Sequence, residues 1–259
     1  MMSNSFSYIF LFFVLTSAAI RVWLSLRQIR SVRSNRNEVP TAFSKDISLE
    51  SHQKAASYTE AKMRLSNIST ATDTTLLLIL TFGGLLNGFH HLASSLSSHP
   101  IISGLVFFGL IGLFLSLVQL PADLYKTFVL EEKFGFNKMS VGLFFKDFLI
   151  GLLVASIIGS IFIAGLLWVM EMAGVNWWWY AWALAMSFWF FIQYLSPTLL
   201  APIFNKFSPL DNESLKDRIE NLLKKCGFQS GGLFVMDGSR RSSHGNAYFT
   251  GFGKSKRIV

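Results

Sequence analysis

The sequence predicts an all-α protein that crosses a membrane five times and ends in a small cytosolic tail of mixed α and β structure. Three observations predict this: 51% of the 259 residues are hydrophobic, only 15% are charged, and the apolar residues gather in long runs. Soluble proteins carry about a quarter charged residues. A helix needs about 20 apolar residues to cross a bilayer, where lipid cannot satisfy an exposed backbone.

Five apolar segments are long enough to span a membrane. They comprise residues 6–26, 74–96, 101–124, 148–173 and 177–200. The first does not resemble a signal peptide, because its basic residues follow the apolar run, from Arg21 onward, and none precedes it. We therefore expect a five-helix membrane domain over residues 1–205 and a tail domain over residues 206–259.

The basic residues predict the orientation of the spans. Nine of the 23 Lys and Arg lie between Arg21 and Arg64, four lie between Lys126 and Lys146, and ten follow from Lys206 onward. Five spans place these three groups on one side, and the opposite side carries no Lys or Arg. The positive-inside rule then predicts an outside or lumenal N-terminus and a cytosolic tail. A bacterial inner membrane and an endoplasmic-reticulum membrane both remain open.

The net charge of +8 does not indicate a nucleic-acid partner. The basic stretches contain no nucleic-acid-binding motif and no platform of interleaved aromatic and basic residues. Basic loops on the cytosolic side are instead typical of contact with anionic lipid headgroups. We expect membrane lipids as partners and no nucleic acid.

The segments outside the spans predict further local structure. Residues 28–73 form a long loop with helical character over 47–65, and residues 125–146 form a second loop. Pro197 and Pro202 are expected to kink or end the fifth helix. The tail elements follow from amphipathic spacing, from Gly227 as a helix stop and from short β-rich runs. They are a helix over 211–225, a strand within 232–237, and two strands over 246–252 and 256–259.

Several side chains are candidates for chemistry. Polar residues in or near the spans either bond between helices or line a hydrated cavity: Asn87, Gln119, Asp123, Gln193 and the pair Lys146 and Asp147. Arg240, Arg241 and His244 form either a solvated loop or an anion-binding cluster. The strand from Asn246 offers an exposed edge that could pair with an extended peptide.

The histidines do not form a recognisable metal motif. Helical zinc peptidases carry His-Glu-x-x-His, in which two histidines bind the metal and the glutamate acts as general base. None of the five histidines begins such a motif. His90 and His91 are adjacent and point to different faces of a helix, so interfacial or cavity-lining roles are favoured over metal binding.

Five ordered blocks resemble the CAAX prenyl protease type I family of integral-membrane zinc metalloproteases. They cover residues 47–58, 128–139, 197–207, 235–239 and 243–259. The resemblance implies a seven-helix ring around a water-filled chamber and a cytosolic zinc site that cleaves peptides, including the tails of prenylated proteins. It also implies that Asn246, Ala247 and Tyr248 hold the substrate backbone beside the zinc.

The resemblance carries over no catalytic residue and no metal ligand, because no residue matches the family's zinc-binding helix. We therefore expect the tail to be the start of a truncated cytosolic peptidase domain that binds no zinc, although the complete family protein does. The expected function is that of the N-terminal membrane portion of a zinc metalloendopeptidase, inactive by itself. The alternative is a non-catalytic scaffold or peptide-binding pseudoprotease. Peptide affinity that falls when proline replaces Tyr248 is the expected sign of edge pairing.

Overall fold

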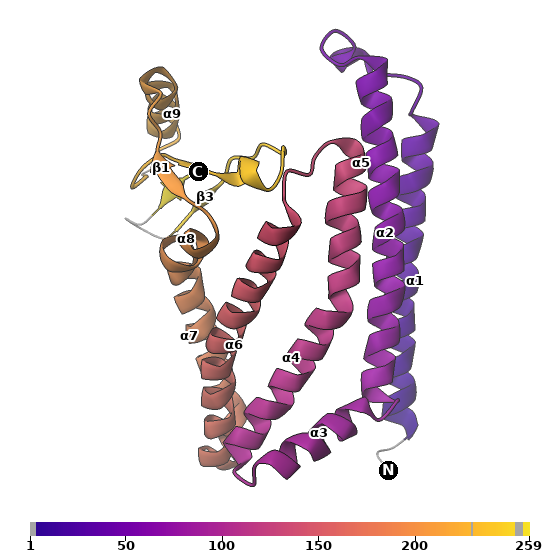
Figure 1. The fold of residues 1–259 in the computed structure, drawn as a ribbon, viewed down its shortest axis with the longest axis vertical. Coiled ribbons are helices and arrows are strands. Elements are labelled where there is room, and N and C mark those ends of the chain that lie inside the picture. Colours follow the sequence, from indigo (N-terminus) through magenta and orange to yellow (C-terminus); the bar gives the residue numbers. More distant parts are fainter. Residues whose placement is uncertain (1–3, 229, 252–255) are drawn as a thin grey trace. The chain divides into compact units, whose positions relative to one another are not determined.

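The structure is a computed structural model that describes residues 4–228, 230–251 and 256–259 (Figure 1). The chain forms two compact units. The first comprises Met1–Ser95 and Phe114–Gly135, and the second comprises Leu96–Leu113 and Phe136–Val259. Helix α4 (Pro100–Tyr125) contributes residues to both units. The division into domains at residues 205 and 206 stays a prediction.

The first unit is built on two long antiparallel helices. They are α1 (Asn4–Ser34) and α2 (Leu49–Thr81), with the short helix η1 (Thr41–Phe43) between them. Their contact buries Ile29 and Ala56, and the Ser25 hydroxyl donates to the backbone oxygen of Met63 at 3.4 Å. The Ser48 side chain accepts a hydrogen bond from the Ser51 N–H and so caps α2.

The prediction of a long loop over residues 28–73 is wrong for most of its length, since both helices extend into it. The helical character predicted over 47–65 is confirmed. The polar sequence conceals these extensions, because packing between the two helices stabilises them more than local propensity does.

The second predicted span is not one continuous helix. Helix α2 ends at Thr81, and α3 (Leu85–Leu96) leaves it at an angle of 56°. A Cβ at Gly83 would lie 2.5 Å from the Ile79 carbonyl oxygen, and Gly84 has a φ of 76°. Two adjacent glycines allow the backbone to turn where other residues would clash or be strained.

The third predicted span extends beyond its expected end. After α4, a π-helical turn (Lys126–Glu131) and α5 (Glu132–Phe134) continue the helix. The predicted loop over 125–146 is therefore helical in its first part, and Gly135, at a φ of 79°, ends the helix. The Tyr58 hydroxyl donates to Glu131 at 2.8 Å and its ring packs on Phe134, which ties this end to α2.

The second unit contains the remaining apolar helices. They are α6 (Val141–Met172), η3 (Gly174–Asn176), α7 (Trp177–Leu195), the π-helical turn η4 (Ser196–Leu200) and α8 (Ala201–Phe204). Small residues let these helices approach closely. A Cβ at Gly104 would lie 2.4 Å from a methyl carbon of Leu167. Pro197 lies within the π-helical turn and Pro202 within the last helical turn, so the expected distortion is confirmed.

The apolar helices have the properties of membrane spans. Among the residues that the structure describes, four helices are long and apolar enough to cross a bilayer, and the bent pair α2 and α3 would make five. On α6, Leu149, Leu153, Ile157 and Ile161 form a row at four-residue spacing, and each is more than half exposed. Exposing such a row to water is unfavourable, whereas lipid accommodates it. The chain is a multi-pass membrane protein.

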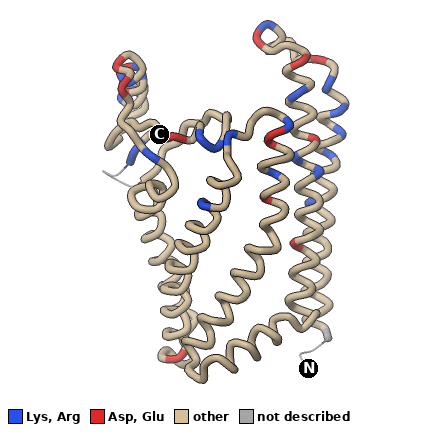
Figure 2. The backbone as a smooth tube through the Cα atoms, in the orientation of Figure 1, with Lys and Arg blue, Asp and Glu red and all other residues tan. Residues whose placement is uncertain are grey.

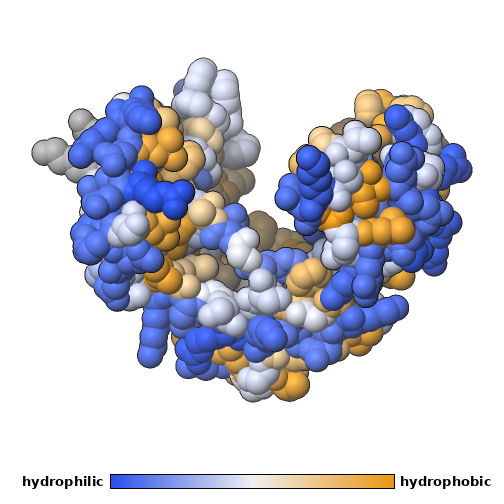
Figure 3. Space-filling model, turned by 90° about the horizontal axis from the view of Figure 1, so that it is seen from above, coloured by the Kyte–Doolittle hydropathy of each residue, from blue (hydrophilic) through white to orange (hydrophobic). Residues whose placement is uncertain are grey.

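Charged residues gather away from the apolar segments in each unit. In the first unit they cluster on the parts of α1 and α2 next to residues 35–48, and in the second they cluster on the tail (Figure 2). Both of these regions present mainly hydrophilic side chains in the space-filling view (Figure 3). This separation is the one expected where polar loops lie in water and the helices lie in lipid.

Besides a 3₁₀ turn at Gly238–Arg240, the described part of the tail contains one α-helix and four short strands. They are β1 (Phe207–Pro209), α9 (Glu213–Lys225), β2 (Phe234–Met236), β3 (Phe249–Thr250) and β4 (Arg257–Ile258). Strand β1 pairs antiparallel with β2, and β3 with β4. A parallel bridge between Leu233 and Ile258 connects the two sheets.

The tail prediction is largely confirmed. Helix α9 begins within two residues of the expected start, and Gly227 follows its end at a φ of 64°. Strand β2 lies inside the predicted range, whereas β1 was not predicted. The strand predicted over 246–252 is shorter, and its last residue, together with the turn at 253–255, lies outside the described residues.

Candidate functional site

The outer strand of the tail sheet is β3. Just before it, Tyr248 and Val259 exchange two backbone hydrogen bonds of 2.9 Å, and Thr250 pairs with Arg257. Bonds alternate along an antiparallel ladder, so the N–H and C=O of Phe249 point to the opposite edge, away from β4. Since the Ile258 N–H donates to the Gly232 carbonyl, β4 is enclosed between two segments and β3 forms the edge.

The side chains around this edge are largely exposed. Phe249 is 72% exposed and its ring packs edge-on against that of Phe228, with centroids 5.7 Å apart. The Tyr248 hydroxyl lies 3.7 Å from the sulfur of Met236, on the other face of the strand. An accessible aromatic side chain beside outward-facing backbone groups is suited to hold an extended segment of another chain.

The three predicted binding residues lie together at the start of this edge. Asn246, Ala247 and Tyr248 are all exposed, and the Asn246 side-chain oxygen accepts from the Ala247 N–H at 2.9 Å. Their role in binding stays a prediction. The proline test at Tyr248 needs correction, because its N–H belongs to the hairpin and proline there would break the Val259 pairing. Phe249 was missed, because the register of the ladder cannot be read from the sequence.

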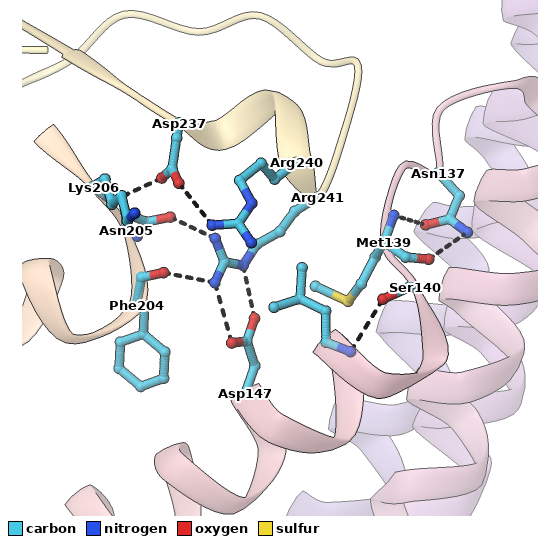
Figure 4. A network of polar contacts seen from close by, with 11 residues as sticks. Asn137, Met139, Ser140, Asp147, Phe204, Asn205, Lys206, Asp237, Arg240 and Arg241 are labelled. Carbon is cyan, nitrogen blue, oxygen red and sulfur yellow. Dashed lines mark hydrogen bonds and ion pairs between the residues drawn. The ribbon is translucent and has the colours of Figure 1, made fainter. Parts of the chain in front are cut away.

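Arg241 anchors the loop that leads to this edge (Figure 4). Its guanidinium donates to both carboxylate oxygens of Asp147 on α6, at 2.7 and 3.1 Å. It also donates to the Asn205 side-chain oxygen at 3.0 Å and the Phe204 carbonyl at 2.6 Å. The hydrogen bonds to Asp147 raise the pKa of Arg241 above its usual range. The contacts of Arg241 therefore differ from both interpretations of its loop, because its side chain binds Asp147 rather than water or a free anion. They also identify the partner of Asp147, whose role the sequence left open.

Asp237 holds the beginning of the same loop. Its carboxylate accepts from the backbone N–H of Lys206 at 2.8 Å and from the Arg240 side chain at 3.3 Å. These contacts, the Lys206 N–H first among them, lower the pKa of Asp237. The Asp237 N–H donates in turn to the Lys206 carbonyl, so the loop is joined to the chain just before β1.

The histidines are not arranged as a set of zinc ligands among the described residues. The His90 and His91 rings lie 6.1 Å apart and tilted, the His52 ring bonds to the Asn35 carbonyl, and the His244 ring stacks on Phe136 at 4.0 Å. Within residues 4–228, 230–251 and 256–259, no three His, Cys, Asp or Glu side chains lie close enough to share a metal ion. The described residues therefore do not fit a zinc centre.

Comparison with known families gives two adjacent matches. Residues 28–206 match the family described as "CAAX prenyl protease N-terminal, five membrane helices", and residues 209–259 match peptidase family M48. The first match covers more than half of the chain and ends where β1 begins. The matched range begins after most of α1, and among the described residues it contains the apolar helices α4, α6 and α7 and the bent pair α2 and α3.

Individual relatives agree with these matches. The chain is 34% identical to CAAX prenyl protease 1 of Saccharomyces cerevisiae over 95% of its own length and 56% of the relative's. It is 35% identical to the human CAAX prenyl protease 1 homolog, with 95% and 54% covered. The crystal structure of S. mikatae Ste24p superposes with a TM-score of 0.85 at 32% identity, over 96% of this chain and 59% of that one. The chain thus spans somewhat more than half the length of these relatives.

Proposed function

The chain belongs to the CAAX prenyl protease family, and we propose that it forms the membrane-embedded and peptide-binding portion of such a protease. The substrates proposed are prenylated peptides, held as an added strand along β3. One observation supports this most: Phe249, at the edge of the sheet, directs its backbone groups away from β4. Strand addition of this kind obtains affinity from main-chain hydrogen bonds.

We propose that catalysis in this family uses zinc held by residues other than those described. The described residues do not fit the metal, and their contribution is to bind and orient the peptide. The N-terminus would lie outside or in the lumen and the tail in the cytosol, because the basic residues flank the spans on one side. The seven-helix ring around a water-filled chamber, which the family resemblance implies, is part of this proposal.

Peptide binding tests the proposal directly. The purified chain in lipid nanodiscs is titrated against a fluorescent, farnesylated CAAX peptide, and anisotropy is measured. We expect saturable binding that is weaker for the same peptide without its farnesyl group, because the lipid chain buries apolar surface. Binding that does not saturate, or that empty nanodiscs reproduce, would refute the proposal.

A pair of variants at one position tests the edge itself. Phe249→Pro removes the outward N–H while the hairpin bonds of Tyr248 and Thr250 remain, since proline is tolerated at such an edge. The matched control is Phe249→Ala, which removes the same ring and keeps the N–H. We expect proline to weaken peptide binding about fivefold relative to alanine, because one net hydrogen bond is worth about 1 kcal/mol. Equal affinities would show that the peptide does not pair there.

A non-catalytic scaffold or peptide-binding pseudoprotease is the second candidate, since the outward-facing backbone of Phe249 would serve it equally well. It predicts peptide affinity without hydrolysis. Incubation of the chain with the farnesylated peptide and zinc, followed by mass spectrometry, tests whether the chain cleaves by itself, which neither candidate predicts. Cleavage that a chelator abolishes would exclude the scaffold.

A further inference from the structure

The loop between Asp237 and His244 is held from two sides. On one side the Arg241 guanidinium makes four hydrogen bonds, two to Asp147 and two to the end of α8. On the other side its backbone carbonyl accepts from the N–H of Lys138 at 3.1 Å. Arg241 therefore connects its own loop to α6, to the end of α8 and to the segment around Lys138.

The segment before α6 extends this second side. The Ser243 N–H donates to the Phe136 carbonyl at 3.0 Å, Asn137 and Ser242 form an antiparallel bridge, and the His244 ring stacks on Phe136. Helix α6 begins directly afterwards, and Ser140 caps it by accepting from the Leu143 N–H at 3.2 Å. The loop is thus fixed to the start of α6 by both its main chain and its side chains.

These contacts lie close to the proposed binding edge. Only His244 and Gly245 separate the bonded residue Ser243 from Asn246, and a chain advances at most about 3.6 Å per residue. A displacement of the loop by a few ångströms must therefore move the edge or break the Tyr248–Val259 pairing. The position of the edge depends on how firmly the loop is held.

We propose that Arg241 is a positioning residue that sets the peptide-binding segment 246–250 relative to α6 through its forked contact with Asp147. The proposal rests on the proposed function, since it assigns that segment to peptide binding. Arginine suits this role because its planar guanidinium can bind a carboxylate in two places and donate to further acceptors at the same time. Lysine keeps the charge but lacks the fork, so Arg241→Lys should not restore the geometry.

The partial burial of the pair strengthens the argument. The side chains of Arg241 and Asp147 are 20% and 19% exposed, whereas Arg240, which binds Asp237, is 58% exposed. Exposed ion pairs are screened by water and salt and contribute little to rigidity. Arg240 therefore provides a matched control: it is a neighbouring arginine with a carboxylate partner and without the fork.

The test combines hydrogen exchange with peptide binding, using the full chain in nanodiscs. Exchange is followed in fragments that contain the amides of Tyr248 and Val259, which bond across the hairpin. We expect Arg241→Lys and Asp147→Asn each to accelerate this exchange about tenfold. Each should also weaken the binding of the farnesylated peptide about tenfold. Arg240→Lys should change both by less than twofold. Exchange in α9 reports that the variants remain folded.

A double-mutant cycle distinguishes a specific contact from general destabilisation. If Arg241 and Asp147 act through each other, the double variant should be no worse than either single variant, because the first substitution already removes the interaction. Additive effects in the cycle would overturn the inference.

The remaining outcomes also decide the inference. Unchanged exchange in Arg241→Lys would overturn the inference. Faster exchange with unaltered peptide affinity would also overturn it, but would leave the proposed function intact. If the unsubstituted chain binds no peptide, the proposed function fails, while the exchange rates still show whether Arg241 fixes the segment.

Discussion

Two contacts between arginine and carboxylate hold different parts of this molecule, and they differ in their surroundings. In the first unit, Glu60 on α2 binds both Arg33 and Arg64, whose side chains are 54% and 62% exposed. In the second unit, Arg241 and Asp147 are each about one-fifth exposed and join residues 94 positions apart. The Glu60 contact supplements two helices that already pack along their length. The Arg241 contact is a main connection between a loop and a helix.

From this comparison we expect an arginine–carboxylate contact to contribute more to stability in the second unit than in the first. The Glu60 carboxylate is only 18% exposed, but both of its arginines compete with water and salt and stay solvated when the contact is lost. A partly buried pair loses more when one partner is removed, because the other remains in a poorly solvated position. The predictions below test this difference, starting with the largest expected effect.

Removing the carboxylate at Asp147 should have the largest effect on stability. Asp147→Ala leaves the Arg241 charge with only the Asn205 and Phe204 oxygens as acceptors. We expect the free energy of unfolding to fall by about 2 kcal/mol, the usual range for a hydrogen-bonded charge that loses its partner. Denaturant titration in detergent micelles, followed by tryptophan fluorescence, measures it. A decrease no larger than that caused by Glu60→Ala would contradict the comparison.

A hydrogen bond from an uncharged hydroxyl in the first unit should have an intermediate effect. The Tyr58 hydroxyl donates to Glu131 at 2.8 Å, and burial together with this carboxylate raises the pKa of Tyr58 to about 12. Tyr58→Phe keeps the ring packing on Phe134 and removes the hydroxyl. We expect a loss of about 1 kcal/mol in the same denaturant titration, as for one hydrogen bond. Tyr58→Ala, which also removes the ring, should lose clearly more.

Salt should distinguish the two arginine contacts. Glu60→Gln is expected to destabilise the chain less than Asp147→Asn at low ionic strength. In 1 M NaCl, where the screening length is about 3 Å, the Glu60→Gln difference should disappear and the Asp147→Asn difference should persist. Melting temperatures of both variants at the two salt concentrations provide the measurement. If salt changes the melting-temperature difference equally for both variants, burial does not distinguish the two arginine contacts.

The loss of the Glu60 contact in acid should be the smallest of these effects. Hydrogen bonds from Arg33 and Arg64 lower the pKa of Glu60 to about 2, below the usual value of about 4.3. Because the folded-state pKa is depressed, the stabilisation is present above about pH 4.3 and is lost as the pH falls toward 2. The melting-temperature difference between the unsubstituted chain and Glu60→Gln should therefore shrink across that range. A difference that stays constant would contradict the assignment.

The sequence was sufficient to predict a multi-pass membrane protein with four to five apolar helices and its family, because both depend on many residues. Runs of apolar residues set the length and number of helices, and the resemblance rests on five blocks of 5 to 17 residues. Helix α9 was predictable because its apolar spacing, its cap at Asn212 and its glycine stop agree. Each of these signals is local in the sequence.

The missed features depend on packing between distant residues. The helical extensions over 28–34 and 66–73 carry polar residues, and the contact between α1 and α2 stabilises them. Gly83 and Gly84 lie inside an apolar run that conceals the break in the second span. Asp147 and Arg241 were each singled out as unusual, but nothing in the sequence pairs two residues 94 positions apart. The register that turns Phe249 outward likewise follows only from the pairing of Tyr248 with Val259.

The account's central claim is that a peptide lies along the outer edge of β3. Photocrosslinking tests it most directly, with benzoylphenylalanine introduced at Phe249 or, as a control, at Leu222, which is similarly exposed on α9. The account predicts that a farnesylated peptide is captured from position 249 and not from position 222, and that excess unlabelled peptide prevents the capture. Saturable binding with no crosslink at position 249, or equal capture from both positions, would contradict it.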